Sequence, residues 1–88
     1  MEGSKKEEKW ITVSILYGNQ SKEFSFQVHF NIRRVLEEAI RSFGLQPPME
    51  NYQLFYNNQQ LSDLNKSLQD YGIPDKATLV MAHVHVVG

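Results

Sequence analysis

Large aliphatic side chains recur at every second position near the start of the chain. Over residues 10–17 the apolar set is Ile11, Val13 and Ile15, alternating with Thr12, Ser14 and Leu16. Successive side chains of a β-strand point to opposite faces, so this period of two predicts a strand with one buried face. Residues 18–22 favour a turn, and Phe24, Phe26 and Val28 then recur with the same period. We therefore expect a hairpin whose second strand turns these three side chains toward the core.

The period changes at Asn31, after which apolar residues are spaced three and four apart. This spacing predicts an amphipathic helix. Asparagine is a favoured N-cap residue, and Gly44 stands where a glycine in the left-handed conformation would end the helix. The apolar face consists of Ile32, Val35, Leu36, Ala39, Ile40 and Phe43.

The second half of the chain contains three further strand patterns. Residues 52–56 are rich in aromatic and aliphatic side chains, residues 57–58 favour a turn, and residues 59–61 form a short partner strand. An irregular loop, 67–75, leads to a last strand over residues 77–83. In that strand we expect Leu79 and Met81 to face the core, and Val80 and Ala82 to face the other way.

This order of elements predicts an α+β fold, a β-grasp in which one helix packs across a mixed sheet of four to five strands. With 88 residues, of which 41% are hydrophobic, the chain has room for one small core. We expect a flexible N-terminal tail at 1–8, the β-grasp domain at 9–83, and an extended C-terminal tail at 84–88 that ends in glycine.

Composition narrows the function. A formal net charge of −1 is unlike that of a nucleic-acid-binding protein, and we expect no nucleic acid among the partners. The chain has no cysteine, which excludes disulfides and thiolate metal sites and is compatible with a cytoplasmic location. Residues 1–8 are polar and no long apolar stretch follows them, so we expect neither a signal peptide nor a membrane partner.

One segment of the sequence carries a family resemblance. Leu61, the run Ser-Leu-Gln-Asp-Tyr-Gly-Ile at 67–73 and Ala-Thr-Leu at 77–79 resemble the part of ubiquitin that leads from its short fourth strand into its last strand. The match continues in order from Trp10 to Gly88. The chain is thus identified as a member of the ubiquitin-like β-grasp family, and its unconventional tail and patch resemble those of bacterial ubiquitin-like modifiers.

The resemblance implies a covalent protein modifier. Gly88 would be the conjugation residue, and an E1-like activating enzyme would use ATP to activate its carboxylate. An E2-like conjugating enzyme would carry it as a thioester to target proteins, and a deconjugating or processing protease would act on the product. A terminal glycine suits acyl transfer because it has no Cβ to crowd the attacked carbon. The residues that would thread into the E1 and E2 enzymes are His83, Val84, His85, Val86 and Val87.

The tail departs from the family pattern at two positions. Val87 stands where the family usually has the first glycine of a pair, and a β-branched side chain is stiff and wide for a narrow enzyme channel. Val84 stands where ubiquitin has an arginine that its activating enzyme reads. The resemblance therefore implies a dedicated activating enzyme. A sulfur carrier with a thiocarboxylate on Gly88 is a further alternative, which the valine at position 87 disfavours.

The resemblance also implies a partner-binding patch on the outer face of the sheet. Its residues would be Tyr17, Phe55, Val80 and Ala82. Contiguous exposed apolar side chains often mark a protein-binding surface. The alternative function is therefore a non-covalent ubiquitin-like binding module that uses this face. A third possibility is that the face packs against a tail or another copy of the chain.

The sequence offers no set of catalytic residues. It has no convergent nucleophile and base and no phosphate-binding glycine loop, and we predict that the protein is not an enzyme and needs no cofactor. His83 and His85 alternate along the predicted tail, and with His29 they lack a carboxylate or thiolate companion, so we expect no metal site. Glu37 and Glu38 are adjacent on the predicted helix and are expected to form surface ion pairs.

Overall fold

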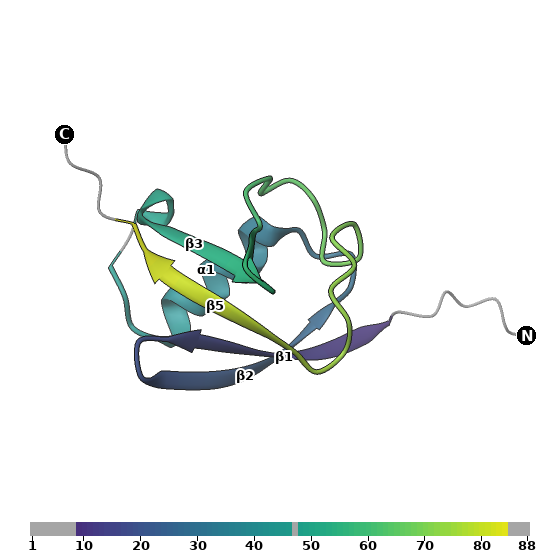
Figure 1. The fold of residues 1–88 in the computed structure, drawn as a ribbon, viewed down its shortest axis with the longest axis horizontal. Helices are drawn as coiled ribbons and strands as arrows, with labels where there is room; N and C mark the ends of the chain where they lie inside the picture. Colours follow the sequence, from purple (N-terminus) through teal and green to yellow (C-terminus); the bar gives the residue numbers. More distant parts are fainter. Residues whose placement is uncertain (1–8, 47, 85–88) are drawn as a thin grey trace, which may run out of the picture.

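One α-helix lies across one face of a mixed sheet, which is the arrangement of a ubiquitin-like β-grasp (Figure 1). The computed structural model describes residues 9–46 and 48–84. In chain order the elements are β1 (Trp10–Tyr17), β2 (Gln20–Gln27), α1 (Ile32–Ser42), the 3₁₀ helix η1 (Met49–Asn51), β3 (Tyr52–Tyr56), β4 (Gln59–Gln60) and β5 (Ala77–His83). The five strands lie in the order β2-β1-β5-β3-β4, and the predicted fold class is confirmed.

The first and last strands of the domain meet at the centre of the sheet (Figure 1). β1 and β5 pair in parallel, whereas β1 pairs with β2, β5 with β3 and β3 with β4 in antiparallel fashion. A parallel pair cannot be closed by a tight turn and needs a long connection. Here that connection is the rest of the domain, including α1.

The hairpin turn is shorter than the sequence predicts. Tyr17 pairs with Gln20, so only Gly18 and Asn19 form the turn, whereas a turn over 18–22 was expected. Gly18 has φ of 62°, a value that a two-residue hairpin turn requires and that glycine adopts without strain. The prediction was wrong because the polar residues 20–22 belong to β2. This is an edge strand, on which exposed polar side chains are common.

The helix has the predicted caps. The Asn31 side-chain oxygen accepts the N–H of Arg34 at 3.0 Å. At the other end Gly44 has φ of 70°, and the Leu45 N–H donates to the Ile40 carbonyl at 2.9 Å. This bond satisfies a carbonyl of the last turn in the manner of a Schellman motif. Both ends of α1 are therefore specified by local sequence.

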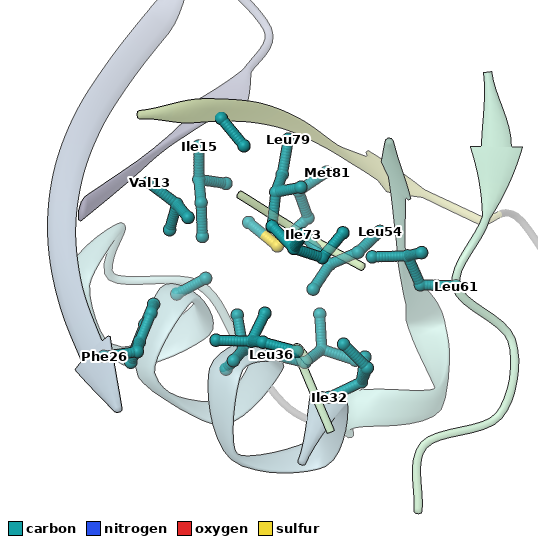
Figure 2. Packing of buried hydrophobic residues seen from close by; sticks show 14 of the residues in the cluster. Val13, Ile15, Phe26, Ile32, Leu36, Leu54, Leu61, Ile73, Leu79 and Met81 are labelled. Carbon is teal, nitrogen blue, oxygen red and sulfur yellow. The ribbon is translucent and has the colours of Figure 1, made fainter. Parts of the chain in front are cut away.

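The core lies between the sheet and α1 (Figure 2). Leu79 and Met81 of β5 are buried, as predicted, and point toward the side of the sheet that α1 covers. Phe26 is buried and Phe24 half-buried, in a stacked pair with ring centroids 5.6 Å apart. The largest fully buried side chains are Ile15, Ile32, Leu36, Leu54, Leu68, Leu79, Met81, Val13 and Val35. No helix in the described part of the chain is long and apolar enough to cross a membrane.

The long loop between β4 and β5 is held by side chains that bond to its own backbone. The Tyr71 hydroxyl accepts the N–H of Asp63 at 2.9 Å. Asp70 accepts the N–H of Ser67 at 3.0 Å, while the Ser67 hydroxyl oxygen accepts the N–H of Asp70 at 3.0 Å. Hydrogen bonds from Ser67 hold the pKa of Asp70 below its ordinary value; the bond from the Ser67 N–H has the larger effect and the bond from its hydroxyl the smaller. Such reciprocal bonds satisfy backbone groups at a turn.

We expect Leu79→Ala to lower the free energy of unfolding by about 2–5 kcal/mol, because it removes a fully buried side chain and leaves a cavity. The matched control is Val80→Ala, one residue along the same strand, where the side chain is 44% exposed and the change should cost about 1 kcal/mol or less. Urea unfolding followed by circular dichroism measures both. Equal losses would contradict the assignment of the two faces of β5.

We expect Asp70→Ala to destabilise the fold at neutral pH and to matter progressively less in acid. Because the folded state lowers the pKa of Asp70, its contribution is present above the unfolded pKa, which is about 4. The contribution is lost as the pH falls through the lower folded value. Thermal melts at neutral and acidic pH would show the stabilities of wild type and variant converging in acid. A constant difference between them would contradict the role of the charge.

Candidate protein-binding face of the sheet

Three apolar side chains form a row on the face of the sheet that α1 does not cover. Leu16 of β1 pairs with Val80 of β5, and Val80 pairs with Phe55 of β3. Directly paired residues point to the same side of a sheet and lie in contact distance. We call Leu16, Val80 and Phe55 the outer row. Val80 is 44% exposed, whereas Leu16 and Phe55 are half-buried.

Ala82 extends the apolar surface along β5. It follows Val80 on the same face, pairs with Gln53 and is half-buried. The structure thus brings together three of the residues named from sequence, Phe55, Val80 and Ala82. Their side chains come from the two neighbouring strands β3 and β5.

Tyr17 lies on the opposite side of the sheet, so its predicted place on the outer face was wrong. Its ring lies 5.8 Å from that of Phe43 and 6.2 Å from that of Tyr52, measured between centroids. Tyr17 has the same parity along β1 as the buried Ile15, so it must face the helix side. Leu16 takes its place in the outer row. The sequence already indicated the place of Leu16, because Leu16 alternates with the buried residues Ile11, Val13 and Ile15 and must point to the other face.

The surroundings of the outer row are polar but almost uncharged. Parity and register place hydroxyl and amide side chains on this face: Thr12, Ser14, Ser21, Ser25, Gln53, Gln60 and Thr78. Glu23 is the one ionisable residue on the same face of the paired strands. A partner that covers the row therefore has few charges to desolvate and many groups with which to form hydrogen bonds.

The predicted tail begins on the edge of the domain. His83 is the last residue of β5, and its ring lies 5.1 Å from that of Tyr52. The Val84 N–H donates to the Asn51 carbonyl at 2.6 Å, so Val84 is still attached to the domain. The other predicted tail positions, His85, Val86, Val87 and Gly88, lie outside the described residues.

A hollow lies beside the C-terminal half of α1, away from the outer row. It is open to solvent and has a volume of about 470 Å³. Its lining consists of Glu37, Ile40, Arg41, Leu45 and Met49. Arg41 pairs with Glu38 at 3.6 Å on the same helix, which supports the predicted surface ion pairing. Within residues 9–46 and 48–84, no group of three or more His, Asp or Glu side chains is placed to hold a metal ion.

The fold and the uncharged apolar row define a ubiquitin-like β-grasp domain with a candidate protein-binding face. The profile of the TUG ubiquitin-like domain family matches residues 15–81, and the chain belongs to this family. No curated protein sequence is significantly similar to the chain. Ubiquitin-like domains generally serve as non-enzymatic modules with protein partners.

Solved structures show the same fold. A ubiquitin-like domain of an Arabidopsis thaliana protein has a TM-score of 0.79 and 16% sequence identity, with 98% of this chain and 89% of that chain covered. The ubiquitin of Caldiarchaeum subterraneum has a TM-score of 0.77 and 19% identity, with 91% of this chain and 100% of that chain covered. At this level of identity the likeness concerns the fold alone.

Proposed function

We propose that this chain is a protein-binding module that docks its partner non-covalently on the outer row. The observation that carries the proposal is the exposure of Val80 between Leu16 and Phe55 on an almost uncharged face. Membership of a ubiquitin-like domain family supports it, because such domains have protein partners. A cytoplasmic site of action fits the absence of cysteine from the sequence.

The outer row has the composition of an interface centre. A large aromatic side chain and two branched aliphatic side chains stand at the middle of the sheet, and polar groups surround them. Interface energy concentrates in such central apolar residues, while a polar rim excludes water from them. The fold does not need Val80 to be apolar, because the side chain is exposed, so its identity is free to serve binding.

We expect Phe55→Ala and Val80→Asp each to weaken partner binding roughly tenfold or more, since each removes apolar contact at the centre of the face. A photo-reactive amino acid at position 80 identifies the partner by cross-linking, and calorimetry then measures its affinity. Arg41→Ala is the control, because Arg41 is an exposed residue of α1, on the opposite side of the sheet, and binding should be unchanged. Unchanged binding by both folded variants would refute the proposal.

The second candidate function is covalent conjugation through Gly88. It draws support from the tail, because Val84 is held at the end of the sheet and the chain continues from there. Activation would use ATP and a dedicated E1-like enzyme, with His83 to Val87 as the segment that this enzyme and an E2-like enzyme contact. A thiocarboxylate on the same Gly88 would make the chain a sulfur carrier.

We expect a modifier, but not a binding module, to form an adduct that depends on its last residue. The chain is incubated with ATP and a candidate activating enzyme and separated without reductant. If a thioester forms, the gel shows a band of the joined proteins that disappears on reduction and on deletion of Gly88. Residues appended beyond Gly88 are the control, since they block activation and leave binding by the outer row intact. A band that persists without Gly88 would rule out conjugation at that residue.

A further inference from the structure

Trp10 presents a large aromatic surface at the opposite end of β1 from the outer row. Its side chain is 53% exposed, and Trp10 and Val80 are the exposed large hydrophobic residues of the described chain. Leu16 lies six positions after Trp10, or roughly 20 Å away at the usual rise of a strand. The two exposed apolar features are therefore separate surfaces.

Phe30 fixes the position of this exposed tryptophan. The Trp10 and Phe30 ring centroids lie 6.5 Å apart in an edge-to-face arrangement at 70°. Phe30 in turn packs against the buried Phe26, with centroids 6.2 Å apart, and His29 packs edge-on against Phe30 at 5.5 Å. The aromatic cluster is thus continuous with the core, so Trp10 is held in place before any partner arrives. A preorganised aromatic side chain loses little entropy on binding.

Cations border the aromatic cluster. The guanidinium carbon of Arg34 lies 4.3 Å from the centroid of the Phe30 ring, in a cation–π arrangement. Arg33 precedes Arg34 on α1, and a guanidinium N–H of Arg33 donates to the side-chain oxygen of Asn65 at 3.3 Å. Lys9 immediately precedes Trp10 and is exposed. Guanidinium and indole groups together are the side chains most enriched at energetically important interface positions.

Arg34 has acidic neighbours on α1 but no ion-pair partner. Residues 24–36 contain no Asp or Glu, Glu37 and Glu38 follow one turn later, and Glu38 pairs with Arg41. The neighbouring loop reaches this region through the Leu68 N–H, which donates to the Phe30 carbonyl, and its nearby Asp70 carboxylate accepts the Ser67 N–H. Within the described residues Arg34 forms no ion pair. The exposed guanidinium of Arg34 is therefore available to a carboxylate of a partner.

The helix dipole does not favour the two arginines at their positions. Arg33 and Arg34 lie in the first turn of α1, which has no acidic residue, and cations are disfavoured at this end of a helix dipole. Their placement costs some helix stability. An external negative group would turn this repulsion into attraction.

We propose that Trp10, Phe30 and Arg34 form a second protein-binding surface, which takes an acidic peptide segment that carries an aromatic or large aliphatic side chain. The apolar side chain packs against Trp10, and carboxylates pair with Arg34 and Lys9. Complementary charge of this kind accelerates association and selects the partner. The surface is independent of the outer row, so the domain binds one partner at each.

The chain's single tryptophan reports directly on this surface. Wild-type protein selects peptides from a displayed library, and synthetic versions of the enriched sequences are then titrated while the emission of Trp10 is recorded. We expect the enriched peptides to contain Asp or Glu beside an aromatic or large aliphatic residue, and to shift the Trp10 emission. Their affinity should fall with added salt.

Variants locate the peptide. Arg34→Glu and Trp10→Ala should each weaken binding roughly tenfold or more by calorimetry. Arg41→Glu makes the same charge change near the other end of α1 and should leave affinity within about twofold, as should Val80→Asp on the outer row. Thermal melts show whether Arg34→Glu folds. If it does not, Arg34→Gln replaces it in the binding measurement.

The proposal is overturned if the acidic peptides bind Arg34→Glu and Arg41→Glu equally well, or if selection enriches no acidic sequence. It is also overturned if Val80→Asp alone abolishes binding, because the peptide then occupies the outer row. A single-stranded oligonucleotide that quenches Trp10 where no acidic peptide does would assign the surface to nucleic acid instead. Failure here leaves the proposed role of the outer row standing, because that role is tested by different variants.

Discussion

The parallel pairing of β1 with β5 is the interaction on which the rest of the structure depends. It joins Leu16 to Val80, residues far apart in sequence, and is closed by the Thr12 N–H, which donates to an Asp75 carboxylate oxygen at 2.8 Å. The same register turns Leu79 into the core and Val80 out of it. A slip of one residue would exchange the two faces. Stability and the candidate binding face are thus consequences of one alignment, which carries the entropic cost of closing a long loop.

The elements with a strong local signal were predictable from sequence. The helix could be predicted because Asn31 and Gly44 mark its ends and because its apolar residues are spaced three and four apart. Strand β5 could also be predicted, and its bounds and its buried side agree with the alternation of Leu79 and Val80. These features follow from backbone geometry and need no knowledge of the tertiary contacts. The ubiquitin-like class followed from their order together with the resemblance around residues 67–73.

What could not be predicted depends on tertiary context. Tyr17 is an aromatic residue at a strand end, and only its contacts with Phe43 and Tyr52 show that it closes the helix side of the sheet. The polar start of β2 resembles a turn in sequence, yet an edge strand tolerates it. The Trp10 surface also escaped sequence reasoning, because Phe30 and Arg34 join Trp10 only after the hairpin and helix have packed. Local sequence patterns carry no information on such tertiary contacts.

The two candidate surfaces differ in the physical basis of selection. The outer row lies on a nearly uncharged face, so its partners are distinguished by shape and apolar area, and salt has little effect there. The Trp10 surface combines an aromatic side chain with the charge of Arg34, so its encounter rate falls with ionic strength. Strand β1 connects them, with Trp10 near one end and Leu16 near the other. A partner that carried both complementary features on one chain would gain from effective concentration without any change in the shape of the domain.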